Sequence, residues 1–412
     1  MIVILNGDVI RAFIEQCGFE EEIVIMNVLA IRFESFPYGS APAFRTLQLL
    51  KLIASLGNHI TIIAKCFNAD DRFIQEWNYK DTKIRCISVE NEFHSSYKKA
   101  IEQCLTEEQY DLVIRPTSVR HYGVVNRILS QNNMLYLYDS VEWYDASNWR
   151  LQYLDYRYYE FQYLWKFQFK KAAGIIAISR LIQNHFLETN DNVVRIPTIT
   201  DCVNTSYRTE ICNSKIKFIF SGQLDGGKDN VDTFIEALSQ VDPQGIYTQL
   251  DIYGPDVPAV QRHMKNKVHL LQICHNIKIH GKVSQQEAQQ ACFDSDFSVF
   301  FRLDRRSANA GFPTKLGECM TFGTPAICND TGDISLVLKN GINGYLLKTK
   351  SVEEIKKVLE QILLLSMEDR KKMRICARKS AEEFFDYRNY QNAIREVLSA
   401  AYERKGIKYG TV

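Results

Sequence analysis

Short runs of β-branched and aromatic residues alternate with stretches of helical spacing along this chain, and no other feature limits its fold so strongly. One of the helical stretches covers residues 41–56. The runs in the first half cover residues 23–30, 60–64, 111–114, 134–138 and 174–179. Because parallel strands need a crossover between them, usually a helix, this alternation predicts βαβ units and a doubly wound parallel sheet.

A second alternation begins at residues 215–222, after a polar stretch around residues 200–214 in which no apolar period is visible. Its further runs cover residues 249–253, 277–280, 297–301, 325–328 and 345–347. From residue 351 onward the spacing is helical, and the last predicted helix covers residues 389–404. The second half therefore predicts another Rossmann-like sheet, followed by C-terminal helices.

A length of 412 residues exceeds one ordinary core and supports two domains. We predict domains at residues 1–205 and 206–385, with residues 386–412 as a helix that returns toward the first domain. The fold class is therefore α/β, with two Rossmann-like doubly wound domains that face a cleft and C-terminal helices that pack back on the N-terminal domain.

Charge and cysteine content exclude several classes of protein. A net charge of +1 argues against a dedicated nucleic-acid binder. The 11 cysteines include no C-x-x-C spacing, which fits reduced thiols in the cytoplasm.

The start of the chain lacks the basic and apolar regions of a signal peptide, and no long apolar window occurs. Any membrane contact is therefore expected to be peripheral, at the inner face of the cell membrane. The 8 histidines show no ligand spacing, and we expect no metal.

Candidate binding residues follow the strand runs, because ligands bind beyond the carboxyl ends of parallel strands. After the first run, Gly39 and Ser40 form a turn before a helix whose free N–H groups suit an anion. The alternative is a structural turn that needs only Gly39 at positive φ. After the first run of the second half, Gly222 and Gln223 open a loop that leads to Lys228, whose ammonium suits a diphosphate. The alternative there is a solvated lysine.

The third candidate segment reads Gly311, Phe312, Pro313, Thr314 and Lys315, with Glu318 three residues further on. Gly311 lets the backbone approach a ligand, and Pro313 suits the first turn of a helix. Lys315 and Glu318 then share one helix face, where the carboxylate can accept both hydroxyls of a ribose and the lysine can face phosphate. The alternative is a surface ion pair between these two side chains.

These elements, in this order and spacing, resemble the donor domain of family 4 glycosyltransferases with the GT-B fold. The resemblance rests on Ser221, Gly222 and Lys228, on residues 311–318, on Gly323, Thr324 and Pro325, and on residues 340–346. Residues 175–180, followed by Ile196 and Pro197, look like the end of the acceptor domain of that family. The variant of the motif at Gly311 is similar to the branch that builds capsular and other surface polysaccharides.

The resemblance implies transfer of a hexose from a nucleotide-diphosphate sugar to a glycan or lipid-linked acceptor, with retention and without a metal or other cofactor. A UDP-sugar is the expected donor. By the same resemblance Lys228 contacts the donor diphosphate, Glu318 holds the ribose, and Gly39 and Ser40 close over the phosphates. The residues of the segment from Gly311 to Lys315 would complete the donor site.

Two residues of the family pattern are replaced in this chain. Gln223 stands where the family has an arginine, and Ala310 stands where it has the first glutamate of a pair. Asn309 is a candidate substitute for the lost acceptor, and Arg302 or Arg305 for the lost charge. The replacements keep two alternatives open: a non-catalytic, sugar-nucleotide-binding partner subunit of the same fold, and a nucleotide-sugar epimerase.

On the acceptor side, Asp139 and Glu142 follow the run at residues 134–138, where the family often has a histidine or an acid that faces the reacting carbon. We predict that one of these carboxylates orients or deprotonates the acceptor hydroxyl, with Lys228 as the third catalytic residue. The alternatives are that the leaving phosphate takes the proton, and that Asp139 or Ser140 caps a helix.

Residues 153–171 carry aromatic side chains on every helical face, next to Arg157, Lys166, Lys170 and Lys171. Such a segment can dock on an anionic membrane surface. It can also be a buried helix of the acceptor domain, and we favour the buried helix.

Overall fold

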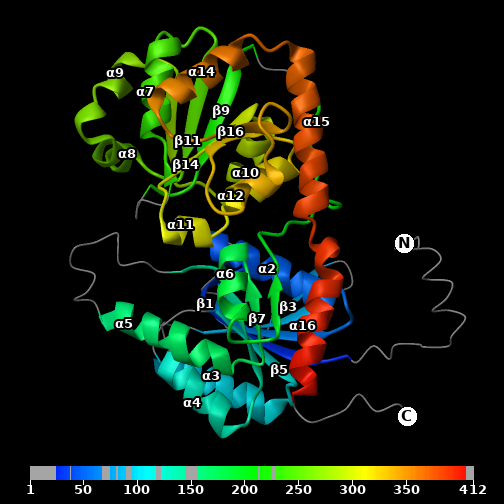
Figure 1. The fold of residues 1–412 in the computed structure, drawn as a ribbon. Helices are drawn as coiled ribbons and strands as arrows, with labels where there is room; N and C mark the ends of the chain where they lie inside the picture. The colour runs from blue at the N-terminus through cyan, green and yellow to red at the C-terminus, as the bar shows by residue number, and fades with distance from the viewer. Residues whose placement is uncertain are drawn as a thin grey trace, which may run out of the picture.

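The structure of the chain, a computed structural model, describes residues 25–37, 39–66, 75–79, 82–89, 94–116, 122–143, 156–211, 214–224 and 229–404. Figure 1 shows two α/β domains, one above the other, each built around its own sheet. The predicted fold class is therefore confirmed. Among the described residues, no helix has both the length and the apolar character that crossing a membrane requires.

The first sheet has the strand order β3-β4-β2-β1-β5-β6-β7-β8, and only the β3–β4 pair is antiparallel. The strands are β1 (Asn27–Phe36), β2 (His59–Cys66), β3 (Gln75–Tyr79), β4 (Thr82–Ser88), β5 (Leu112–Pro116), β6 (Tyr136–Ser140), β7 (Gly174–Ala177) and β8 (Val193–Arg195). The sequence analysis missed β3, β4 and β8. Strand β3 is a largely polar edge strand and β8 has only 3 residues, so neither forms a clear apolar run.

Both faces of the first sheet are covered by helices. These are α2 (Ala41–Ala54), α3 (His94–Glu107), α4 (Tyr122–Gln131), α5 (Tyr156–Tyr163), η3 (Leu164–Gln168), η4 (Phe169–Lys171) and α6 (Arg180–Leu187). Val28 and Ala30 of β1 enter a core with α2, whereas Leu29 and Ile31 enter a separate core with α3 and α4. Because side chains alternate across a strand, burial of both faces produces the continuous apolar run seen in the sequence.

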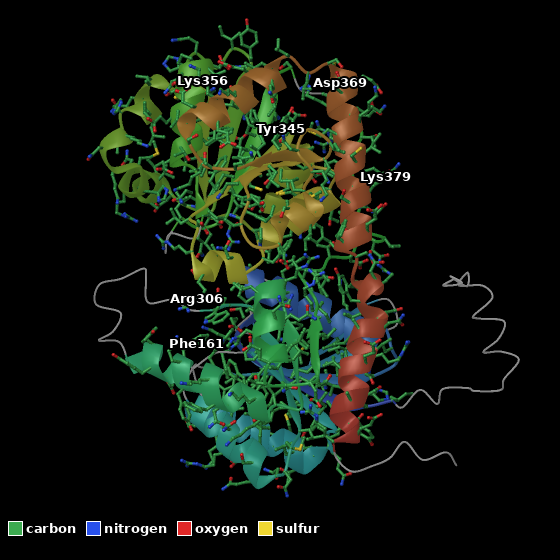
Figure 2. All side chains as sticks on the ribbon, in the orientation of Figure 1. Phe161, Arg306, Tyr345, Lys356, Asp369 and Lys379 are labelled. Carbon is green, nitrogen blue, oxygen red and sulfur yellow. The ribbon has the colours of Figure 1, made fainter. Side chains whose placement is uncertain are left out.

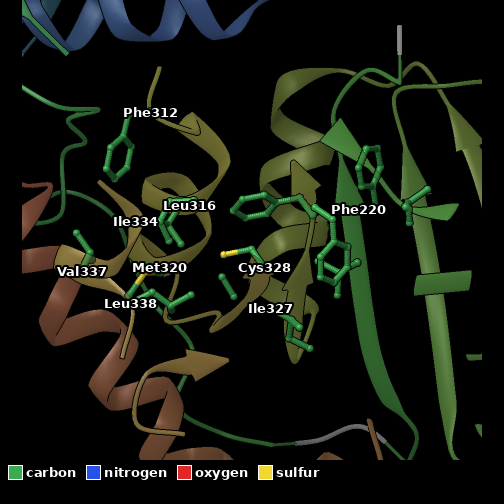
Figure 3. Packing of buried hydrophobic residues seen from close by; sticks show 14 of the residues in the cluster. Phe220, Phe312, Leu316, Met320, Ile327, Cys328, Ile334, Val337 and Leu338 are labelled. Carbon is green, nitrogen blue, oxygen red and sulfur yellow. The ribbon is translucent and has the colours of Figure 1, made fainter. Parts of the chain in front are cut away.

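The second sheet has six parallel strands in the order β12-β11-β9-β13-β15-β16. They are β9 (Ile216–Ser221), β11 (Thr248–Tyr253), β12 (Ile277–Gly281), β13 (Phe297–Val299), β15 (Ala326–Asn329) and β16 (Gly344–Leu347), and each lies on a predicted run. A short antiparallel pair, β10 (Asp229–Asn230) with β14 (Phe301–Arg302), lies beside them. Figure 3 shows Leu316 and Met320 packed into the same core as Cys328.

Twelve further helical segments complete the described part of the chain. The first ten are α7 (Asp232–Val241), α8 (Val257–Met264), η5 (Lys265–Lys267), α9 (Leu270–Ile273), α10 (Gln285–Asp294), α11 (Arg306–Ala310), α12 (Thr314–Thr321), α13 (Ile334–Val337), α14 (Val352–Leu363) and α15 (Met367–Phe384). Two more, η6 (Tyr387–Tyr390) and α16 (Gln391–Glu403), follow at the C-terminal end, which makes twelve in all. The two crossings between the domains lie side by side, because the Thr200 N–H donates to the Phe385 carbonyl at 2.7 Å and the Thr200 carbonyl accepts from the Tyr387 N–H at 3.0 Å. Helix α16 then packs on α2, β7 and β8 of the first domain (Figure 1). The residue limits proposed for the domains stay a prediction.

Candidate active site

Three strands of the second sheet end in glycines that pack against one another. Gly222 N–H donates to the Tyr253 carbonyl at 3.1 Å, and Gly254 N–H donates to the Gly281 carbonyl at 2.8 Å. A Cβ on Gly254, whose φ is 109°, would lie only 2.1 Å from the Gly222 carbonyl oxygen, so the position requires glycine. The carboxyl edge of this sheet is therefore closely packed backbone.

Lys315 of α12 lies at this edge, beside Gly222. A Cβ on Gly222 would lie 2.6 Å from the Lys315 Nζ atom. The same Nζ is 2.8 Å from Asp229 Oδ2 and 4.7 Å from the centroid of the Phe220 ring. The fold therefore brings the second and third predicted segments together, and Asp229 is the counter-ion of the lysine.

Arg302 of β14 is a second cation at the same place, and its side chain is buried. Its Nη1 donates to the Ala308 carbonyl at 2.8 Å, and its Nε lies 3.7 Å from Asp229 Oδ1. Its Nη2 lies 3.7 Å from the position of a Cβ on Gly311. Burial lowers the pKa of Arg302, and the charge of Asp229 opposes that shift. Asp229 thus lies between Arg302 and Lys315, which no local pattern in the sequence indicates.

Asn309 and Arg305, the other candidate substitutes for the lost family residues, do not contact Asp229 or Lys315 in any interaction described for this site. Asn309 donates to Asp304 Oδ1 at 2.7 Å and accepts from Gly332 N–H at 2.9 Å, so its amide ties two loop segments together. The Arg305 side chain makes no hydrogen bond or ion pair with the described residues. Within the described ranges, no three His, Cys, Asp or Glu side chains gather as metal ligands would.

Gly39 and Ser40 form the turn that precedes α2. Gly39 has φ 103°, and Ser40 Oγ accepts from Ala43 N–H at 3.2 Å as the helix N-cap. This is the conformation expected of the structural turn, and the predicted phosphate contact stays a prediction. Gln223 is exposed just after β9. Lys228 lies outside the described residues, so its predicted role as a diphosphate ligand and catalytic residue also stays a prediction.

Glu318 lies one turn after Lys315 on α12 and is half-buried. It makes no hydrogen bond or ion pair with any described residue, and Lys315 pairs with Asp229 instead. The alternative of a Lys315–Glu318 surface ion pair is therefore wrong. Burial raises the pKa of Glu318 to about 7, although the positive charge of Lys315 opposes the shift. Such an unpaired carboxyl is suited to accept hydrogen bonds from the hydroxyl groups of a ligand. Its neighbours Phe312, Pro313 and Thr314 lead into the same helix, with Phe312 and Pro313 buried.

Replacement of Glu318 with Gln is expected to raise the melting temperature of the free protein at pH 8. The folded-state pKa of about 7 exceeds the ordinary value of 4.5, so the folded state binds more protons and loses stability as the pH rises between these values. The neutral amide removes this penalty. The gain should shrink steadily as the pH is lowered toward 4.5. Melting curves of both proteins across this range check the prediction, with Glu383→Gln on the exposed face of α15 as the control.

Asp139 ends β6 in a buried cluster of charges. Its carboxylate accepts from Arg32 Nη2 at 3.1 Å and from Arg45 Nη2 at 2.8 Å. Arg45 also donates to the Pro197 carbonyl at 2.7 Å, which ties β6 to the chain after β8. Both carboxylate oxygens are thus occupied by arginine side chains. We therefore interpret Asp139 as a structural anion, and its predicted role as proton acceptor stays a prediction. Neither Asp139 nor Ser140 caps a helix, because residues 141–143 are not helical.

Glu142 lies in the loop that follows β6 and faces the second domain. Its negative charge is among those that offset the effect of burial on the pKa of Arg302. The carbonyl oxygen of Val141 lies 3.6 Å from the position of a Cβ on Gly311. Two hydrogen bonds join the domains nearby: Ser179 Oγ donates to the Ala310 carbonyl at 2.6 Å, and Arg180 N–H donates to Asp333 Oδ2 at 2.9 Å. The guanidinium of Arg306, which is labelled in Figure 2, lies 5.2 Å from the centroid of the Trp143 ring. The loop after β6 therefore meets the segment around Gly311.

Two Rossmann-like domains whose loops meet beside cations and an unpaired carboxyl define the GT-B architecture. Residues 207–380 match the family model of Glycosyl transferases group 1, so the similarity to this family covers most of the second domain. The sequence resemblance to glycosyltransferases of this fold is thereby confirmed at the level of that domain.

Relatives agree with this assignment. An uncharacterised glycosyltransferase of Methanocaldococcus jannaschii is 26% identical over 211 residues, which are 48% of this chain and 51% of the relative, so the match spans about half of each. The sucrose-phosphate synthase of Thermosynechococcus elongatus has the same fold, with a TM-score of 0.71 and 14% identity over 92% of this chain and 100% of its own. HepE of Anabaena, solved in complex with UDP-glucose, has a TM-score of 0.64 and 14% identity over 91% of this chain and 100% of its own. At these identities the solved structures show the fold alone.

Proposed function

We propose that this protein transfers a sugar from a nucleotide-diphosphate sugar, most simply a UDP-sugar, to a glycan or lipid-linked acceptor. The observation that carries the proposal is the pairing of Lys315 and Arg302 with Asp229 beside Gly222, with Glu318 one turn after Lys315 on α12, within the residues that match the glycosyltransferase group 1 model. The complex of the similarly folded HepE with UDP-glucose supports a donor of this class.

The donor diphosphate would lie against the cations at the carboxyl edge of the second sheet. Lys315 is held there by Asp229 and can exchange part of that ion pair for phosphate oxygens. Glu318, one turn away, would accept the ribose hydroxyls. Positive charge from Lys315 and Arg302 would stabilise the leaving diphosphate, which is the physical basis for proposing a metal-independent transfer. Retention of configuration is proposed from the sequence resemblance alone.

Arg302 favours an enzyme over a non-catalytic partner subunit. Gln223 leaves the glycine-rich loop without the family arginine, but the buried guanidinium of Arg302 supplies a positive charge close to Lys315, through their common partner Asp229. The positive charge that is absent at Gln223 is thereby supplied by Arg302 of β14. Ala310 has no comparable replacement among the described residues, because Asn309 bonds to neighbouring loops.

On the acceptor side we propose Glu142 as the residue that orients the reacting hydroxyl. It is half-buried and lies on the loop that faces the second domain, whereas Asp139 is buried between arginines. The motif at Gly311 supports a place among enzymes that build surface polysaccharides. Eight cysteines whose side chains the structure describes are free, which supports a cytoplasmic location.

Purified protein should bind one class of nucleotide sugar and turn it over only when an acceptor is added. Thermal-shift measurements with UDP-, GDP-, ADP- and CMP-sugars identify the donor, since ligand at 100 times its dissociation constant stabilises the fold by about 2.7 kcal/mol. Release of nucleoside diphosphate after addition of glycan or lipid-linked acceptors then tests transfer. Binding without turnover under any acceptor would support the partner-subunit alternative, and conversion of the donor without acceptor would support the epimerase.

A further inference from the structure

One face of the segment from α5 to η4 is buried in the large core. Phe161, Leu164, Trp165 and Phe169 belong to the hydrophobic cluster that also contains Tyr138 of β6. For this face, the buried helix that we favoured from the sequence is therefore confirmed. These four side chains are enough to anchor the segment to the first domain, so its opposite face needs no apolar residues for the fold.

The opposite face nevertheless presents aromatic rings to solvent. Tyr159, Tyr163 and Phe167 are 56%, 51% and 49% exposed and are spaced by four residues, so they follow one another along the segment. The rings of Tyr163 and Phe167 lie 5.6 Å apart between centroids. A run of exposed rings that the fold does not require marks an interaction surface.

The exposed charged side chains that the structure describes between residues 158 and 171 are lysines. They are Lys166, Lys170 and Lys171, and Lys166 Nζ lies 5.5 Å from the centroid of the Phe167 ring. Glu160 is the only acidic residue between Tyr156 and Lys171. We call the set Tyr159, Tyr163, Lys166, Phe167, Lys170 and Lys171 the aromatic–lysine stripe. In Figure 1, α5 projects from the first domain on the side opposite to α16.

We propose that the aromatic–lysine stripe docks the protein on an anionic lipid surface. Amphipathic rings enter the headgroup region, and lysines beside them contact lipid phosphates while their stems cover apolar surface. A second copy of the chain is a poor occupant, because two stripes of the same charge would repel each other. The docking is a property of the first domain and does not depend on the proposed donor chemistry.

Flotation of the purified protein with lipid vesicles tests the proposal. We expect binding to phosphatidylcholine vesicles that contain phosphatidylglycerol, weak binding to phosphatidylcholine alone, and loss of binding at high salt. The double substitution Tyr163→Ser and Phe167→Ser should abolish binding. Lys166→Ala with Lys170→Ala should weaken it roughly thirtyfold, at about 1 kcal/mol for each lysine. Leu364→Ser, at an 87% exposed position of the second domain, is the matched control and should bind as the wild type does.

All variants should keep the wild-type melting temperature and the wild-type response to donor nucleotide, because the substituted side chains are exposed. Equal binding to neutral and anionic vesicles, or unchanged binding of the ring variant, would overturn the docking proposal and leave the donor site untouched. Self-association that the ring substitutions remove, without vesicle binding, would also overturn it. Failure of nucleotide binding in a protein that still floats with anionic vesicles would count against the proposed function alone.

Discussion

Replacement of Lys315 with Ala should weaken donor binding by between roughly tenfold and 150-fold, because a charge-assisted hydrogen bond contributes about 1.5–3 kcal/mol. The upper end is expected, since the change removes the ammonium 2.8 Å from Asp229 and leaves that carboxylate to repel the phosphates. Turnover should fall with binding. Isothermal titration with the donor nucleotide and initial rates of transfer measure the two effects.

Two further variants make this experiment specific. Lys379→Ala removes an exposed lysine of α15, labelled in Figure 2, and should change neither binding nor rate. Adding Asp229→Asn to Lys315→Ala removes the repelling carboxylate and should restore part of the lost affinity. If Lys315→Ala binds nucleotide as the wild type does, the donor lies elsewhere and the proposed site is misplaced.

Replacement of Asp139 with Ala should lower the free energy of unfolding by about 3–5 kcal/mol, the usual cost of leaving a buried charge without its partner. Arg32 and Arg45 both lose their counter-ion, and their side chains are only 4% exposed. The ties from Arg45 to the carbonyls of Ile196 and Pro197 would be strained by the same change. Chemical denaturation followed by circular dichroism measures the loss.

Glu142→Gln is the matched control for Asp139, because it lies on the same segment but is only half-buried. Its free energy of unfolding should stay within about 0.5 kcal/mol of the wild type, while transfer slows. A loss of turnover without a loss of stability at Asp139 would decide against our interpretation. If Asp139→Asn keeps its stability and loses turnover, the catalytic role predicted from the sequence is right and the structural role is wrong.

Much of the fold can be predicted from local patterns. All six strands of the second sheet lie on apolar runs, and β1 shows the unbroken run of a strand buried on both faces. Strand β3 is different, because its polar residues at the sheet edge give no such signal. In the site, the glycine and proline spacing predicts α12 and its shared face for Lys315 and Glu318.

By itself the sequence determined which residues share a helix face or end a strand, because such neighbours depend only on the spacing of a regular backbone. The tertiary structure decided the ionic partners. Lys315 pairs with Asp229, 86 residues away, instead of with Glu318. Asp139 is held by Arg32 and Arg45, 107 and 94 residues away in the sequence. Such pairings depend on the order of strands in the sheets and on which loops meet across the domains, and local spacing carries no information about either.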